Sequence, residues 1–237
     1  MPIDVQAAQQ LWDAFRKRWP IDTLKAMPIE QYSRVDDKDT FTYWLESKTE
    51  NLGSIWGGSS FKFGIYHRGS DEAKPSGRGR IFGEHYAWYG KYGTTPEEAY
   101  KTVRDLIVRI AEAARDRRFQ DIESFDLGPA VKWKIAFLYQ PTETPAILPI
   151  FKQEILLALT GQKQGSYPEL SRTLLSKKGA ETFYAYASQL WEQGKAILDQ
   201  KLLPEKALDF LQKRFSAIKE PVKYMSGFET ESGRQIG

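Results

Sequence analysis

Aromatic residues constrain this chain most, because they make up 14% of its 237 residues and include seven tryptophans and twelve tyrosines. So many large rings must fill a core, form an interface or stack on a ligand. Hydrophobic residues account for 41% of the sequence and charged residues for 27%, which is a globular composition. A chain of this length buries a sizeable core, as one large domain or two small ones, without disulfides or a structural metal.

The sequence has no cysteine and only two histidines, His67 and His85. This composition excludes disulfides, iron–sulfur clusters, thiolate zinc sites, cysteine nucleophiles and multi-histidine metal sites. No apolar run approaches the ~20 residues of a membrane span, and residues 1–20 do not resemble a secretory signal. We therefore expect a cytoplasmic protein with no membrane partner. The net charge of +3 permits a polyanionic partner without requiring one.

Apolar residues at helical spacing, together with N-capping pairs, predict helices in both halves of the chain. Thr95 with Glu98, and later Ser166 with Glu169, match the capping-box pattern at the start of a helix. The expected helices are 4–19, 96–118, 166–177, 180–199 and 204–219.

Alternation of apolar and polar residues predicts the strands. It is strictest between Val131 and Tyr139, where large apolar side chains occupy every second position, and 131–151 is expected to form a hairpin. The expected strands are 40–46, 61–66, 81–92, 131–139 and 146–151. These elements predict an α+β fold with a mixed or antiparallel sheet of about five strands and flanking helices, followed by a helical C-terminal module.

A change in composition along the chain suggests its division into domains. Residues 1–160 are expected to form the α+β module and residues 161–225 the helical module. Residues 226–237 are poor in apolar side chains and resemble a tail or a linker.

A glycine-rich segment runs from Trp56 to Lys62 and combines two glycines, two serines and a lysine. Successive amides of Gly57 and Gly58 could face one anion. The segment is not a P-loop, because no Gly-Lys-[Ser/Thr] opens a helix here, and no other segment offers a nucleotide motif. We therefore expect no cofactor and no nucleotide hydrolysis by that route. A tight loop between strands, with glycines at positive φ, remains the alternative.

Basic residues alternate with aromatic residues across neighbouring expected strands and loops. Cations contact phosphates, and aromatic faces stack on bases, so the pattern favours nucleic-acid binding. The alternative is that about half of these rings are core residues of an α+β domain. The candidate nucleic-acid-binding residues are Trp56, Gly57, Gly58, Ser59, Ser60, Lys62, Tyr66, Arg68, Arg78, Arg80, Trp88 and Tyr89.

A second set of residues carries a weak nuclease-like pattern. Asp36 and Asp39 precede Glu46-Ser-Lys48, and Mg²⁺-dependent nucleases need converging carboxylates and a lysine. A Glu-x-Lys triplet recurs by chance in any chain with 27% charged residues, so a solvated strand end is the competing interpretation. No metal site is expected outside this alternative.

Residues 41–66, with the run Leu-Gly-Ser-Ile-Trp-Gly-Gly-Ser-Ser-Phe-Lys, resemble the N-terminal regions of McrB-like proteins. Residues 132–139 and 147–151 are similar to a later segment of the same regions. The McrB-like proteins are subunits of modification-dependent (type IV) restriction systems, in which a variable DNA-recognition region precedes an AAA+ GTPase motor that works with a separate McrC nuclease. This chain lacks the motor's Walker and sensor motifs, so the resemblance implies a recognition region alone.

The leading hypothesis is a DNA-binding domain that recognises modified bases, with no catalytic activity of its own and with an AAA+ motor and a McrC-type nuclease as partners in antiviral defence. Lys62, Arg68, Arg78 and Arg80 would hold phosphates, and an aromatic ring would stack on a base. The alternatives are a Mg²⁺-dependent nuclease at Glu46 and a protein-interaction adaptor that docks through its C-terminal helices. The base modification is not readable from the residues.

Overall fold

The structure, a computed structural model, describes residues 4–70, 72, 76–201, 216–217, 228–229 and 235–236. The chain divides into two compact units, Met1–Trp191 and Glu192–Gly237. The helices are α1 (Val5–Arg18), α2 (Ile21–Lys25), α3 (Ile29–Tyr32), α4 (Phe41–Tyr43), α5 (Pro96–Arg115), α6 (Phe119–Glu123), α7 (Pro129–Tyr139), α8 (Gln153–Thr160), α9 (Tyr167–Leu175) and α10 (Phe183–Lys201). Among the described residues, no helix combines the length and the apolarity needed to cross a bilayer.

Short helical turns and strands connect these helices. The π-helical turn is η1 (Trp44–Lys48), and the 3₁₀ turns are η2 (Glu50–Leu52), η3 (Ser60–Phe63) and η4 (Gly90–Tyr92). The strands of the first unit are β1 (Ile65–His67), β2 (Arg80–Phe82) and β3 (Tyr86–Tyr89). The second unit contains the two-residue strands β4 (Ser216–Ala217), β5 (Phe228–Glu229) and β6 (Gln235–Ile236).

The capping signals locate the helices well. Asp4 accepts hydrogen bonds from two amides at the start of α1, and Ser166 and Glu169 form a reciprocal capping box at the start of α9. At α5, the Thr95 hydroxyl caps the Glu98 amide as expected, but the Glu98 carboxylate accepts from the Thr94 N–H and hydroxyl instead. Helices 4–19, 96–118 and 166–177 are therefore confirmed within a few residues.

The expected strand 131–139 is wrong, because these residues form most of helix α7. Alternation distinguishes a strand from a helix only when one face is polar and exposed. Every residue from Val131 to Tyr139 is buried, including Lys132 and Lys134, so the apparent polar face does not exist. The expected hairpin 131–151 is absent for the same reason.

The expected strand 40–46 is also helical. The Thr40 hydroxyl accepts a hydrogen bond from the Tyr43 amide and starts α4, which continues directly into the π-helical turn η1. Thr49 ends this turn, with its hydroxyl donating to the Trp44 carbonyl at 2.8 Å. Of residues 61–66, the first three lie in η3 and only the last two reach β1.

The sheet of the first unit has three antiparallel strands in the order β1–β3–β2, so the expectation of about five strands is wrong. The fold remains α+β only in a loose sense, since most of it is helical. In the C-terminal part, α10 matches the expected helix 180–199, whereas 204–219 lies outside the described residues except for Ser216–Ala217, which form β4. The tail expected at 226–237 contains β5 and β6.

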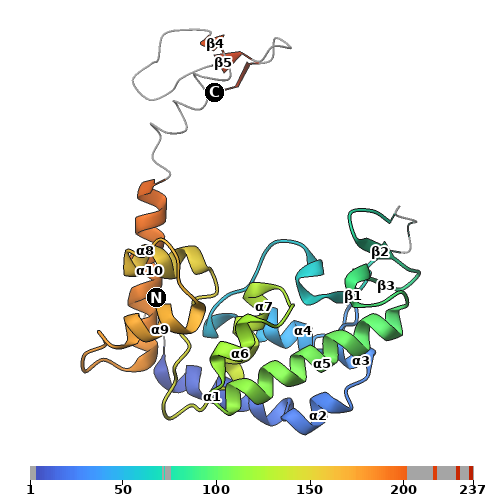
Figure 1. Cartoon of the computed structure of the whole chain (residues 1–237), viewed down its shortest axis with the longest axis horizontal. Coiled ribbons are helices and arrows are strands. Elements are labelled where there is room, and N and C mark those ends of the chain that lie inside the picture. The colour runs from blue at the N-terminus through green and yellow to red at the C-terminus, as the bar shows by residue number, and fades with distance from the viewer. Residues whose placement is uncertain are drawn as a thin grey trace. The chain divides into compact units, whose positions relative to one another are not determined.

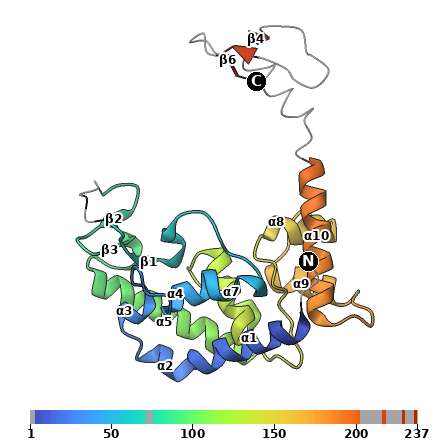
Figure 2. The same cartoon turned by 180° about the vertical axis from the view of Figure 1, so that it is seen from behind.

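Helix α7 forms the centre of the first unit and packs against α1, α5 and α6, as Figures 1 and 2 show from opposite sides. The Trp12 ring stacks on Phe137 at a centroid distance of 4.5 Å, and its indole N–H donates to the Leu138 carbonyl at 2.8 Å. The Tyr139 hydroxyl donates to the Trp19 carbonyl at 2.5 Å. Much of the aromatic content therefore serves the core, with the polar ends of the rings satisfied by backbone.

Lys134 of α7 is completely buried. Its Nζ donates to the carbonyl oxygens of Thr49 at 2.6 Å, Leu52 at 3.2 Å and Gly53 at 2.6 Å. Burial lowers the pKa of Lys134 well below its usual value, and the Glu50 carboxylate opposes that shift. The three carbonyls also oppose it, because only an ammonium supplies three N–H donors.

We expect Lys134→Met to lower the free energy of unfolding by about 3 kcal/mol, because a methionine of similar length leaves buried carbonyls without donors. Urea denaturation measures the change. Lys101→Met on the exposed face of α5 is the control and should change stability by less than about 0.5 kcal/mol. A Lys134→Met protein as stable as the wild type would contradict the assigned role.

Candidate nucleic-acid interface

Trp56 is the most exposed large apolar side chain among the described residues. Its exposed fraction is 73%, against 38% for Val5 and 37% for Val35. The other exposed large apolar side chains are thus aliphatic and about half as exposed. A large aromatic ring exposed to this degree can stack on a ligand without rearrangement of the core, so Trp56 is the ring most available for binding.

Two lysines fix the segment that carries this tryptophan, residues 53–59, which we call the Trp56 loop. At its start, Lys134 holds the Gly53 carbonyl, and a Cβ on Gly53 would clash with the Pro149 carbonyl oxygen. At its end, Lys62 Nζ donates to the carbonyls of Ile55 at 2.7 Å and Gly57 at 2.9 Å. The loop is therefore held on both sides of Trp56.

The two glycines of the loop allow the backbone to turn sharply after Trp56. Gly57 and Gly58 have φ angles of 95° and 74°, in the region that favours glycine, and a Cβ on either would meet no atom within 4 Å. Ser59 caps η3 by accepting from the Phe61 amide, and Ser60 is the exposed first residue of that turn. The conformation thus agrees with the tight-loop interpretation, and the loop does not lead into a strand but into η3.

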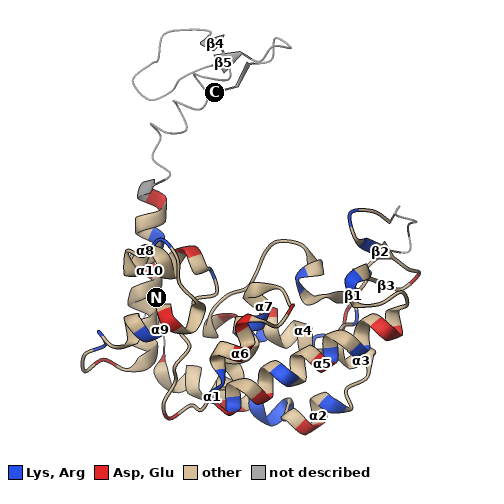
Figure 3. Ribbon diagram, in the orientation of Figure 1, with Lys and Arg blue, Asp and Glu red and all other residues tan. Residues whose placement is uncertain are grey.

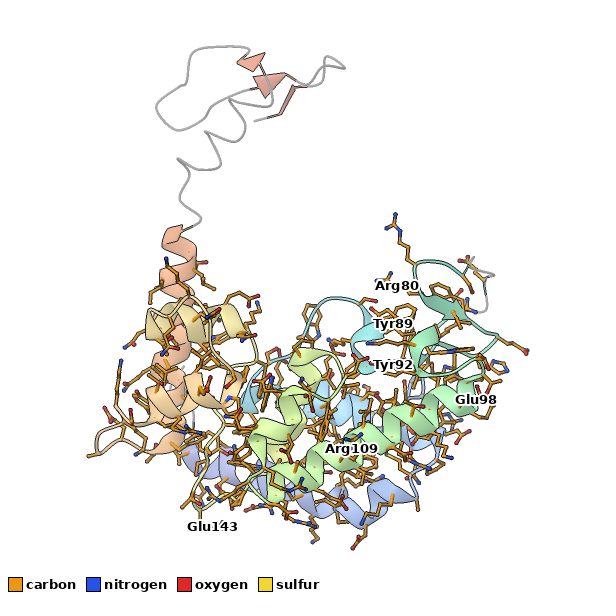
Figure 4. All side chains as sticks on the ribbon, viewed as in Figure 1. Arg80, Tyr89, Tyr92, Glu98, Arg109 and Glu143 are labelled. Atoms are coloured by element: carbon orange, nitrogen blue, oxygen red, sulfur yellow. The ribbon has the colours of Figure 1, made fainter. Side chains whose placement is uncertain are left out.

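One face of the sheet is aromatic. Tyr66 and Phe82 both pair with Ala87 of β3, and Arg80 pairs with Tyr89, so their side chains share a face. Tyr66, Phe82 and Tyr89 are each half-buried, and Arg80 is exposed. We call these four residues the aromatic face; Arg80 and Tyr89 are labelled beside β2 and β3 in Figure 4.

Phe61 of η3 organises the aromatic face. Its ring lies 5.2 Å from Tyr66, 5.6 Å from Phe82 and 5.0 Å from Tyr89, centroid to centroid, and Arg80 lies over it at 4.8 Å. Sequence reasoning missed Phe61 and Phe82 as site residues. The two-residue spacing of Arg80 and Phe82 was the available signal, because it puts both side chains on one face of a strand.

The structure divides the four cations expected to hold phosphates into two pairs. Lys62 is bound to Glu46 and two carbonyls, and the buried Arg68 donates to the carbonyls of Gly83, Glu84 and Glu72. Arg78 and Arg80 are exposed, and their guanidinium groups make no hydrogen bond or ion pair with another residue in the described part of the chain. Figure 3 shows this basic segment leading into β2.

Trp88 does not join the aromatic face. It points to the opposite side of β3 from Tyr89, is 3% exposed, and donates its indole N–H to the Gly93 carbonyl at 2.9 Å. It therefore serves the core. Trp56 is the exposed ring of the candidate set, and Tyr66 and Tyr89 are its half-exposed rings.

The carboxylates of the nuclease alternative do not converge. Asp39 accepts from Lys48 at 3.2 Å, from the Trp44 indole at 2.7 Å and from Arg18 at 3.0 Å, whereas Glu46 is bound to Lys62. Asp36 lies in the same connection between α3 and α4 as Asp39, with φ of 63°, and takes no part in these contacts. Within residues 4–70, 72 and 76–201, no group of three histidine or carboxylate side chains could hold a metal ion.

No protein-family model, curated protein or solved structure matches this chain.

Trp56 should provide most of the quencher-accessible tryptophan fluorescence, because five of the other tryptophans are 0–8% exposed. We expect Trp56→Phe to shift the emission maximum to shorter wavelength and to remove most of the acrylamide quenching. Trp88→Phe is the matched control and should leave the quenching in place. Unchanged quenching in Trp56→Phe would show that the loop folds back onto the protein.

Asp39 should contribute to stability at acidic pH. The Trp44 indole N–H, with Arg18 and Lys48, lowers the pKa of Asp39 to about 2, despite a smaller opposing effect of burial. A depressed carboxyl pKa stabilises the fold above the unfolded pKa of about 4, and this stability is lost as the pH falls toward about 2.

We therefore expect the free energy of unfolding to fall less steeply between about pH 4 and pH 2 in Asp39→Asn than in the wild type. The side chain is 51% exposed, so the difference should stay below about 1 kcal/mol. Urea denaturation across this range measures it. Asp105→Asn, on the exposed face of α5, is the control, and identical slopes for all three proteins would contradict the assignment.

Proposed function

We propose that this chain is a DNA-recognition module of a McrB-like, modification-dependent restriction complex. The observation that carries the proposal is the display of Trp56 on a loop that Lys62 and Lys134 hold in place. A ring fixed in advance loses little conformational freedom on binding, so more of the stacking free energy remains as affinity. Stacking on an aromatic ring contributes about 1–3 kcal/mol per base.

The division of the cations supports the same function. Arg78 and Arg80 are free to contact phosphates, and Arg80 is held over Phe61 beside Tyr89. Arginine provides a planar fork that matches two phosphate oxygens. Lys62 and Arg68 shape the surface rather than contact the nucleic acid. With two free cations, we expect the phosphate contribution to be modest and the aromatic contribution to dominate.

Recognition of a modified base needs more than an extra apolar contact. One methyl group in an apolar pocket is worth about 1 kcal/mol, which is less than a tenfold preference. Strong selectivity therefore needs a base turned out of the duplex and read by hydrogen bonds as well as by stacking. Trp56 would occupy the space left in the stack or cover the extruded base.

The resemblance of residues 41–66 to McrB-like proteins supplies the biological setting of the proposal. An AAA+ motor and a McrC-type nuclease would act on the DNA that this cytoplasmic module selects, and the module itself would cleave nothing. Asp39 and Glu46 pair with different lysines, Lys48 and Lys62, and do not converge on one point. This favours a module that binds DNA over the nuclease alternative.

Fluorescence anisotropy with short duplexes, with and without 5-methylcytosine, tests the proposal from about 50 to 200 mM salt. We expect Trp56→Ala to weaken binding by about 5- to 150-fold, the equivalent of one lost stack. Arg80→Ala should weaken binding to all sequences and reduce the salt slope by about 1.

Lys163→Ala removes one exposed charge from the loop before α9 and serves as the matched control, with binding expected to stay near the wild-type value. Absence of binding to any duplex at low salt would overturn the proposal and favour the adaptor alternative, in which Trp56 contacts a protein. Cleavage of the DNA in Mg²⁺, lost in Glu46→Ala, would instead support the nuclease.

A further inference from the structure

A second candidate site lies in the first unit, where the α5–α6 connection, the loop 141–146 and helix α9 meet. They enclose a cleft of about 470 Å³, a volume within the range of small-molecule sites. The apolar residues Phe119, Pro145 and Leu175 line part of it. Three arginines from two different elements, Arg117, Arg118 and Arg172, line the rest.

Arg117 fixes one side of this cleft. It has a φ of 60°, at a helix C-terminus where glycine is the usual residue. Its guanidinium donates to the Thr144 carbonyl at 2.8 Å and to the Thr144 hydroxyl, which ties the loop 141–146 to the end of α5. The cleft is therefore held open by a specific side-chain contact and not by loop backbone alone.

The other two arginines differ in their pairing. Arg118 forms an ion pair with Asp121 at 2.8 Å, and Asp121 is the acidic residue that lines the cleft. Arg172 is exposed, and its guanidinium makes no hydrogen bond or ion pair with another residue of the described segments; its electrostatic partner is Glu169 on the same helix. The lining thus carries three cations and one carboxylate.

Three further carboxylates lie beside these arginines. Asp116 pairs with Arg115 at 2.7 Å and with Arg118 at 3.6 Å, and Glu169, which interacts electrostatically with Arg172, accepts from the amide of Ser166 at 3.0 Å. Glu143, labelled in Figure 4, accepts from the hydroxyl of Thr142 and interacts electrostatically with Arg117. The lining itself holds three arginines and one carboxylate beside an apolar wall, and the exposed Arg172 guanidinium, which makes no direct ion pair within the described segments, is the group available to an anion with a flat or apolar body.

We propose that this cleft binds a 5′-phosphorylated nucleoside, either free or at the end of a DNA strand. The forked Arg172 guanidinium would hold the phosphate, and the Arg118 plane with Phe119, Pro145 and Leu175 would enclose the base. This site is distinct from the Trp56 loop, and it would let the protein sense a nucleotide or a strand end independently of duplex binding.

Isothermal titration of the full chain with AMP, adenosine, inorganic phosphate and a short oligonucleotide with or without a 5′-phosphate tests the proposal. We expect AMP or the 5′-phosphorylated strand to bind at least about tenfold more tightly than adenosine, phosphate or the unphosphorylated strand. The stronger of the two ligands identifies the source of the nucleotide.

Arg172→Ala should weaken this binding by about tenfold or more, and Arg172→Lys should restore it only in part because an ammonium cannot form the fork. Lys177→Ala, an exposed charge just beyond α9, is the matched control and should bind normally. Trp56→Ala should also bind AMP normally, which separates this site from the proposed DNA surface. Loss of binding in Lys177→Ala or Trp56→Ala would count against the cleft.

Three results would overturn the proposal. In the first, neither AMP nor the 5′-phosphorylated strand binds. In the second, they bind equally well to Arg172→Ala. In the third, inorganic phosphate binds as tightly as AMP, which would reduce the cleft to a simple anion site. An acidic peptide that binds where AMP does not would identify a protein-docking surface instead.

Discussion

The buried ammonium of Lys134 is the interaction on which the candidate DNA surface depends. It satisfies the carbonyls of Thr49, Leu52 and Gly53, which follow η1 and span η2, and so joins the central helix α7 to the start of the Trp56 loop. No carboxylate accepts its protons directly, so backbone carbonyls, with the nearby Glu50 carboxylate, offset the cost of burying this group. If the start of the loop moved, the buried Lys134 Nζ and the carbonyls it binds would lose their hydrogen bonds, which disfavours any other conformation. Lys62 likewise donates to two backbone carbonyls of the loop, those of Ile55 and Gly57, and forms an ion pair with Glu46.

Cations serve two purposes in this protein, and their position in the fold decides which. Lys134, Lys62 and Arg68 bind backbone carbonyls and give shape, whereas Arg78 and Arg80 face solvent. On α5, by contrast, basic and acidic residues alternate along the helix (Figure 3), so the helix presents no stripe of one sign. A mildly basic net charge therefore gives a poor measure of how many cations face solvent.

Local signals in the sequence predict the helix starts because capping depends on residues only three positions apart, as at Ser166 and Glu169. The strand predictions failed at Val131–Tyr139 because period-2 alternation carries no information in a segment buried on every side. For the candidate site, the exposed loop at Trp56 and the arginines before β3 were readable from residue type. The burial of Lys62 and Arg68, and the role of Phe61, depend on contacts between segments and could not be read locally.

The two lysine contacts should make the Trp56 loop rigid before any ligand binds. Nitrogen-15 relaxation of the backbone amides of Trp56 and Gly57 in the free protein tests it most directly, with α7 as the internal reference. We expect order parameters near those of α7, about 0.85, and lower values in a Lys62→Met variant. Order parameters below about 0.6 in the wild-type protein would contradict it, because the loop would then be mobile despite its two lysine contacts.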